Sequence, residues 1–279
     1  MSNSLVKWGI RLISGLLAAT VLGSISFVFM YLFNRGRTVI SWSFLTADPA
    51  GMPIGTAGGI FPAIIGTFSL GLFSALIGGT LGVLVAVWLV YYGKQPLLSK
   101  AVYLAVYFLS GLPSIIFGLV GYTVLIFRLG FNRSLFCSGL TVSLMILPFV
   151  AIRVIKILQE HERDYYTQSL SLGISKEYTL LHVVLPDSSV EIIGTVFIGM
   201  AYGMGAVAPI MYTGAVMLSP LPVALDKPFM SLPYHLYLLV SNGLSYEYAY
   251  GTACVLLLLL LVMQCVYRLV HWLFYHRRK

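Results

Sequence analysis

The sequence predicts an all-α, polytopic membrane protein with six transmembrane helices. Hydrophobic residues make up 59% of the 279-residue chain and charged residues only 9%, and the mean hydropathy is +0.92. A water-soluble domain usually carries about 25% charged residues. The chain also contains a series of long apolar runs, each near the roughly 20 residues that a helix needs to cross a bilayer. Because backbone groups in lipid need internal hydrogen-bond partners, helices are expected for these runs.

The six expected spans follow one another along most of the chain. They are residues 12–33, 61–92, 101–127, 134–152, 192–217 and 248–267. Three of them contain an internal proline: Pro113, Pro148 and Pro209. Proline removes a backbone hydrogen bond, so we expect kinked or unwound helix at these points. The pairs Gly78/Gly82 and Gly199/Gly203 have small-x3-small spacing, which favours close approach of neighbouring helices.

Lysine and arginine residues in the loops predict the orientation. With the N-terminus in the cytoplasm, twelve of the 17 lysines and arginines lie on the cytoplasmic side and five lie outside. This bias favours both termini in the cytoplasm of a bacterial cell, with the chain in the inner membrane. The net charge of +8 is then explained by the attraction of basic residues on the cytoplasmic side to anionic membrane lipid. Nucleic acid is not an expected partner, because basic patches interleaved with stacking aromatic residues are absent.

The chain shows no constellation typical of catalysis or of metal binding. Its five histidines are scattered without ligand spacing, and no nucleophile–base arrangement stands out in the spans. Cys137, Cys254 and Cys265 lie in or beside apolar stretches without paired spacing, which is typical of small buried residues. We therefore expect no catalytic residue, no metal site and no cofactor in this chain.

The charged segment at 159–190, between two apolar runs, is the main functional lead. Leucines and valines recur in it at roughly helical spacing. Gly173 permits a turn and Ser175 can cap a second helix, so we expect two short helices separated by residues 173–177. One interpretation is a solvated loop whose amphipathic helices lie on the membrane. The other is a docking helix that transmits force from a partner.

Gly173, followed after nine residues by Val183-Val184-Leu185-Pro186, resembles the EAA loop (E-A-A-x3-G-x9-I-x-L-P) of ABC importer permeases. In that family the loop carries the short helix that docks on the ATP-hydrolysing subunit. The triplet itself departs from the pattern and reads Thr-Gln-Ser, which implies altered contact with the ATPase. The docking residues that the resemblance implies are Thr167, Gln168, Ser169, Gly173, Ile174, Leu185 and Pro186.

Further motifs are similar to phosphate-type importer permeases of the A-subunit (PstA-like) kind, and the similarity covers most of 44–279 in order. The motifs are Ser110-Gly111-Leu112-Pro113-Ser114-Ile115-Ile116-Phe117-Gly118, Leu147-Pro148 followed by Arg153, Ala208-Pro209-Ile210-Met211-Tyr212-Thr213, and Met230-Ser231-Leu232-Pro233. The resemblance implies a type I ABC importer permease fold that works by alternating access. The pathway residues expected for an anion offer hydroxyls and a cation: Ser110, Ser114, Arg153, Tyr212 and Thr213.

The resemblance also implies partners and a division of the chain. The partners are two copies of an ABC ATPase that hold ATP and Mg²⁺, a second permease subunit (PstC-like or a copy of this chain), and an extracytoplasmic phosphate-binding protein. Membrane lipid surrounds the assembly. Residues 1–61 form the first transmembrane helix and an extracytoplasmic loop, 62–272 a five-helix permease core with the cytoplasmic coupling loop 159–190, and 273–279 a basic cytoplasmic tail.

The fifth span departs from the family pattern R-x-x-G-E-T-A-P, because an Arg and a Glu have become Tyr202 and Ala206. Intramembrane charges are usually functional, so this departure keeps two alternatives open. One is a permease for an oxyanion other than phosphate. The other is a degenerate assembly subunit whose partner permease carries the substrate contacts. A third hypothesis, a carrier or channel that works without ATP, would need no docking loop, and the internal repeat common in such folds is not seen.

Overall fold

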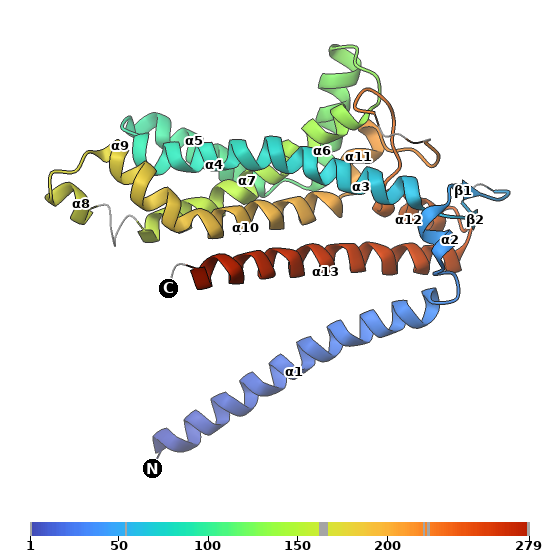
Figure 1. Ribbon diagram of the computed structural model, residues 1–279, viewed down its shortest axis with the longest axis horizontal. Coiled ribbons are helices and arrows are strands. Elements are labelled where there is room, and N and C mark those ends of the chain that lie inside the picture. Colours follow the sequence, from blue (N-terminus) through green and yellow to red (C-terminus); the bar gives the residue numbers. More distant parts are fainter. Residues whose placement is uncertain (1, 54, 162–166, 220, 222–223, 278–279) are drawn as a thin grey trace.

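The computed structural model describes residues 2–53, 55–161, 167–219, 221 and 224–277, and this part of the chain is predominantly helical (Figure 1). Five of its helices are long and apolar enough to cross a membrane, and a bent helix pair makes a sixth candidate. The five are Val6–Gly36, Phe61–Tyr92, Leu135–Glu160, Lys176–Met204 and Tyr246–Leu269. The prediction of an all-α membrane protein is therefore confirmed, and six spans result if the bent pair counts as one.

The elements follow the chain in the order labelled in Figure 1. The α-helices are α1 (Ser2–Gly36), α2 (Trp42–Thr46), α3 (Phe61–Ser74), α4 (Thr80–Val87), α5 (Pro96–Ser110), α6 (Ser114–Gly121), α7 (Leu135–His161), α8 (Thr167–Ser171), α9 (Lys176–Thr179), α10 (Leu185–Met204), α11 (Ala208–Thr213), α12 (Leu232–Ser241) and α13 (Tyr246–Arg277). Strands β1 (Pro49–Ala50) and β2 (Ala57–Gly58) form an antiparallel hairpin. Short π-helical segments continue several helices: η1 (Ala75–Gly79), η2 (Trp88–Tyr92), η3 (Tyr122–Arg128) and η5 (Leu180–Val184).

Helix α7 is the central helix of the bundle, and glycines on its neighbours allow close packing. A Cβ atom on Gly78 would lie 2.4 Å from the carbonyl oxygen of Ser143 in α7. A Cβ atom on Gly203 of α10 would lie 2.9 Å from Val142 Cγ1. Helices that approach to backbone distance gain van der Waals contact, which is a main source of helix association in lipid. The expected close approach at the two glycine pairs is therefore confirmed.

The third expected span, 101–127, is broken rather than straight. Helices α5 and α6 with η3 meet at an angle of 104°. The break falls at Gly111–Pro113, because proline has no N–H to donate and disfavours helix in the residue before it. Pro148 has a milder effect, since α7 runs through it without a break in the helix.

The fifth expected span, 192–217, is wrong in its limits. The spanning helix starts sixteen residues earlier, at Lys176, and ends at Met204. Its first part carries charged residues, so a search for uncharged runs misses it. Beyond Met204 the chain leaves the helix at Gly205 and starts α11 with Pro209 at its second position, where the missing N–H costs nothing.

The two ends of the bundle differ in the elements that they carry (Figure 1). One end holds α8 and α9 together with the N-terminal end of α1 and the C-terminal end of α13. The other end holds α2, the β1–β2 hairpin and α12. The C-terminal end of α1 approaches α13 at that second end, where the Tyr31 and Tyr250 hydroxyls lie 3.2 Å apart. The N-terminal part of α1 lies away from the bundle (Figure 1).

Candidate functional site

A cavity of about 300 Å³ lies where the third span breaks. We call it the upper cavity. It is lined by Leu109, Ser110, Leu112, Phe117, Met145, Pro148, Phe149, Ile152, Arg153 and Tyr202. The end of α5 supplies Ser110, whose hydroxyl donates to the carbonyl oxygen of Tyr107 at 2.7 Å. The hydroxyl oxygen still has lone pairs, and the break of the helix leaves it exposed.

Arg153 and Tyr202 bring polar groups to the upper cavity from two other helices. Arg153 lies on α7 and Tyr202 on α10, and both side chains are exposed. The Tyr202 ring lies 5.9 Å from the ring of Phe149, which holds it against α7. Pro148 also lines the cavity, and its missing N–H leaves the carbonyl of Leu144 without its helical donor. An anion in this cavity would meet one guanidinium and two hydroxyls against an apolar wall.

A second cavity, of about 380 Å³, lies nearer to the α8 end of the bundle. We call it the lower cavity. Its lining residues are Arg153, Lys156, Ile157, Glu160, Glu191, Gly194, Thr195, Ile198 and Tyr267. They come from α7, α10 and α13, and Arg153 is shared with the upper cavity. The two cavities are therefore neighbours that share this residue in their linings.

The structure brings only part of the expected pathway together. Ser110 and Arg153 line the upper cavity. Ser114, at the start of α6, and Tyr212, beside Gly118, are half-buried outside its lining. Thr213 is fully buried, and its hydroxyl donates to the carbonyl of Pro209 at 2.8 Å. In this conformation Thr213 therefore packs α11 against α7, where Ser138 Oγ lies 2.9 Å away, rather than facing a cavity.

The residues that replace the family's charges in the fifth span lie in different surroundings. Tyr202 lines the upper cavity, whereas Ala206 is buried in an apolar cluster with Leu70, Phe117 and Ile210. A carboxylate at position 206 would be buried among apolar side chains, which is costly without a partner. Sequence reasoning missed Tyr202, Lys156 and Glu191 as lining residues. The available signal was helical spacing, because Lys156 follows Arg153 by three residues on α7 and Glu191 precedes Tyr202 by eleven residues, about three turns, on α10.

The loop at 159–190 contains the two helices expected from its sequence, as far as the described residues 159–161 and 167–190 go. Gly173 follows α8 with φ of +77°, a left-handed conformation that favours glycine. The amide of Ile174 donates to the carbonyl of Ser169 at 3.1 Å and closes the end of α8. Ser175 caps α9, as expected, by accepting from the amide of Tyr178 at 3.4 Å. Helix α9 is not a separate surface helix, however, because it continues through η5 into α10.

Thr167, Gln168 and Ser169 form most of α8, which projects at the end of the bundle (Figure 1). Gln168 is exposed, and so is the apolar side chain of Leu172 just before the turn. Leu185 and Pro186 lie apart from α8, in the first turn of α10, where both are half-buried. The structure thus separates an exposed part, α8 and its turn, from the Leu-Pro block that joins it to the bundle.

Lys176 attaches the start of α9 to the second span. Its ammonium group donates to the carbonyl oxygen of Tyr91 and lies 5.0 Å from the centre of the Tyr92 ring. The Tyr91 hydroxyl in turn donates to the carbonyl of Leu158 in α7 at 3.4 Å. A cation over an aromatic face adds to the hydrogen bond. The base of the loop is therefore tied to η2 and, through it, to α7.

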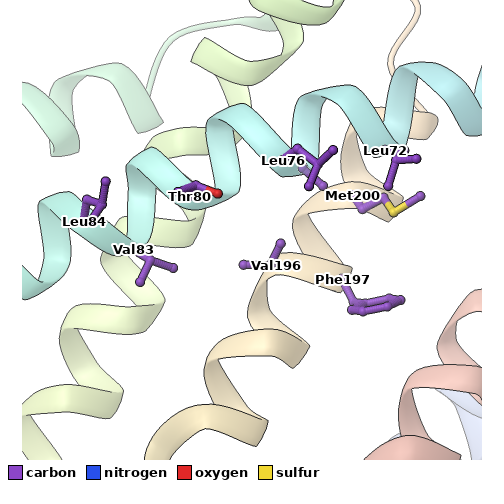
Figure 2. A pocket seen from close by; sticks show the side chains of 9 residues that line it. Leu72, Leu76, Thr80, Val83, Leu84, Val196, Phe197 and Met200 are labelled. Carbon is purple, nitrogen blue, oxygen red and sulfur yellow. The ribbon is translucent and has the colours of Figure 1, made fainter. Parts of the chain in front are cut away.

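A third cavity, of about 340 Å³, is chemically different (Figure 2). It lies between the α3–η1–α4 helix and α10, and Figure 2 shows apolar side chains from both sides facing it. Its lining is Leu72, Ala75, Leu76, Thr80, Val83, Leu84, Val196, Phe197 and Met200. With a single hydroxyl and no charge in its lining, this third cavity suits apolar groups rather than an anion.

The sequence matches the family described as "Binding-protein-dependent transport system inner membrane component" over residues 78–273. The chain belongs to this family. It is thus a multi-pass permease of the inner membrane. Among its relatives, a protein named phosphate transport system permease protein PstA 2, from Mycobacterium bovis, is 30% identical over 86% of this chain and 79% of its own length.

Two more comparisons extend this result. A probable phosphate transport system permease protein PstA from Methanocaldococcus jannaschii is 26% identical and covers 74% of this permease and 73% of its own length. Among solved structures, an inward-facing MetNI methionine ABC transporter matches with a TM-score of 0.57 and 18% identity, over 76% of this permease and 93% of that chain. The structural match supports the type I ABC importer permease fold expected from the sequence.

Proposed function

We propose that this permease is one transmembrane half of an ABC importer that carries inorganic phosphate into the cell by alternating access. The observation that carries the proposal is the upper cavity, where Ser110, Arg153 and Tyr202 converge at the break of the third span. A guanidinium presents planar paired donors that fit a tetrahedral oxyanion. The names of the relatives favour phosphate among such anions.

Helix α8 is proposed as the docking helix for the ATPase. It projects at one end of the bundle and presents Gln168 and Leu172 to a partner. In this arrangement two ATPase subunits hold ATP and Mg²⁺, and their closure pushes on α8. The α8 end and both termini then face the cytoplasm. A second permease completes the pathway, and an extracytoplasmic phosphate-binding protein delivers the anion to the α12 end.

A second candidate function is an assembly subunit whose partner permease makes the substrate contacts. The burial of Ala206 in an apolar cluster favours it, because that position offers no charge to an anion. The same observation is compatible with an importer for another oxyanion. The three possibilities differ in whether Arg153 matters for uptake and in which anion moves.

The test is uptake by the reconstituted complex in proteoliposomes, with its ATPase, its second permease and its binding protein. We expect ATP-dependent entry of labelled phosphate, and at least about tenfold slower entry with Arg153→Gln, because hydrogen bonds to a charged group are lost. Arg128→Gln, at an exposed arginine outside both cavities, is the matched control. Sulfate entry without phosphate entry would mean that the importer carries another oxyanion. Equal uptake rates for Arg153→Gln and Arg128→Gln would favour the assembly subunit.

A further inference from the structure

The two cavities follow one another along the seam between α7 and α10, and we call this line of lining residues the path. Position 199 of α10 lies against Val150, and position 203 lies against Val142, so the helices run antiparallel. The lining residues of α10 are spaced at three or four residues, and those of α7 are as well, so each set lies on one helix face. The sets are Glu191, Thr195, Ile198 and Tyr202 on α10, and Phe149, Arg153, Lys156 and Glu160 on α7.

The charge of the lining changes along this path. The upper cavity has one cation, Arg153, and no carboxylate among its lining residues. The lower cavity adds Lys156 but also two carboxylates, Glu160 and Glu191. All four charged side chains are exposed. Within the described part of the chain, no ion pair within 4 Å joins these cations to these carboxylates.

An anion therefore meets different surroundings in the two cavities. In the upper cavity a single guanidinium attracts it beside an apolar wall. In the lower cavity the same guanidinium and Lys156 attract it, while the carboxylates repel it and compete for the cations. The formal charge of the lining falls from +1 to zero towards the α8 end. Binding should weaken in that direction.

Resting on the proposed function, we infer that the lower cavity is a release station for the phosphate anion and that Glu191 is the residue that weakens binding there. Glu191 lies on α10, across the seam from Arg153 and Lys156, whereas Glu160 lies on the same helix as both cations. The Glu191 carboxylate pairs with Arg153 and Lys156 as the anion leaves. The residue acts on release and not on docking, since it lies on α10, two turns beyond the end of η5.

The experiment measures phosphate retention and turnover in the complete importer complex. With Glu191→Gln we expect labelled phosphate to be retained several-fold longer by the purified complex and uptake turnover to fall several-fold, because one repulsive charge is removed. Lys156→Gln should shorten retention, an effect of opposite sign. Glu191→Asp keeps the carboxylate and should restore most of the wild-type behaviour. Glu247→Gln, at an exposed carboxylate of α13 outside both cavities and outside the coupling loop, is the matched control.

The outcomes separate this inference from the proposed function. If the wild-type complex takes up phosphate and Glu191→Gln behaves like Glu247→Gln, the release role is overturned and the importer remains. If Glu191→Gln and Lys156→Gln change retention in the same direction, the charge argument fails as well. A wild-type complex that moves no phosphate contradicts the proposed function itself. A loss of complex yield with Glu191→Gln, not rescued by Glu191→Asp, would point to a structural role and overturn the inference.

Discussion

His235 is a fully buried titratable side chain at the end of the molecule opposite to α8. It lies on α12, and its Nδ1 atom is 3.2 Å from the hydroxyl of Thr252. Its Nε2 atom is buried and has no hydrogen-bond partner in the described part of the chain. A Cβ atom on Gly55 would lie 3.3 Å from Nε2 and 2.6 Å from Met217 Cε, so the hairpin loop closes over the ring.

Burial lowers the pKa of His235 to about 4 from an ordinary value near 6.5. The pKa of His235 is lower in the folded state than in the unfolded chain. Above pH 6.5 the ring is neutral in both states, and the fold keeps its full stability. The contribution of the neutral ring is lost as the pH falls from 6.5 towards 4, and it amounts to about 3 kcal/mol. We expect the melting temperature in detergent to fall over this range, and His235→Leu to flatten the pH dependence. His182→Leu, at an exposed histidine, should leave it unchanged.

At the scale of the element, the conformation of the turn after α8 depends on one backbone position, Gly173. Gly173 has φ of +77°, and among the described residues no atom outside its chain neighbours lies within 4 Å of a Cβ placed there. A substitution at this position therefore acts through backbone strain and not through a clash. Asparagine tolerates the left-handed region, whereas β-branched valine does not.

We expect Gly173→Val to reduce ATPase recovery with the purified permease by about tenfold or more, since left-handed backbone costs roughly 1–2 kcal/mol or more per residue. Gly173→Asn should retain most of the binding. Membrane insertion should be normal for both variants, as measured by the yield of the folded chain. Equal ATPase recovery for the valine and asparagine variants would mean that the turn does not orient a docking helix.

How far the sequence predicts each element depends on the range of the interactions that form it. The turn at Gly173 and the cap at Ser175 follow from local rules and are confirmed. Pro113 indicates irregular backbone, but no local rule gives the 104° bend. The start of the fifth span at Lys176 is missed because its first part carries charged residues, and the packing of this part against η2 and α7 is not visible in the sequence. Tertiary packing sets which faces of α7 and α10 oppose each other, and hence why Glu191 and Arg153 line the same cavity.

At the scale of the whole molecule, one chain of contacts joins the α8 end to the cavities. Helix α8 continues through its turn into α9, and Lys176 attaches α9 to the carbonyl of Tyr91. The Tyr91 hydroxyl reaches the carbonyl of Leu158 in α7, one to two turns from Arg153. Buried side chains of η2, α7, η5 and α10 pack in one apolar cluster around these bonds. A push on α8 would therefore move α7 and α10, the helices that form the seam, as one body.

Lys176→Met removes the hydrogen bond and the cation–aromatic contact while keeping an apolar stem of similar length. We expect ATP hydrolysis by the complex to continue and the phosphate moved per ATP to fall several-fold, because α8 would then move without η2 and α7. Lys94→Met, at an exposed lysine just after η2, is the matched control. The two variants differ in whether they break the connection between α9 and η2. If both move wild-type amounts of phosphate per ATP, the push reaches the seam through the continuous helix from Lys176 to Met204 alone, and α7 follows by packing against α10.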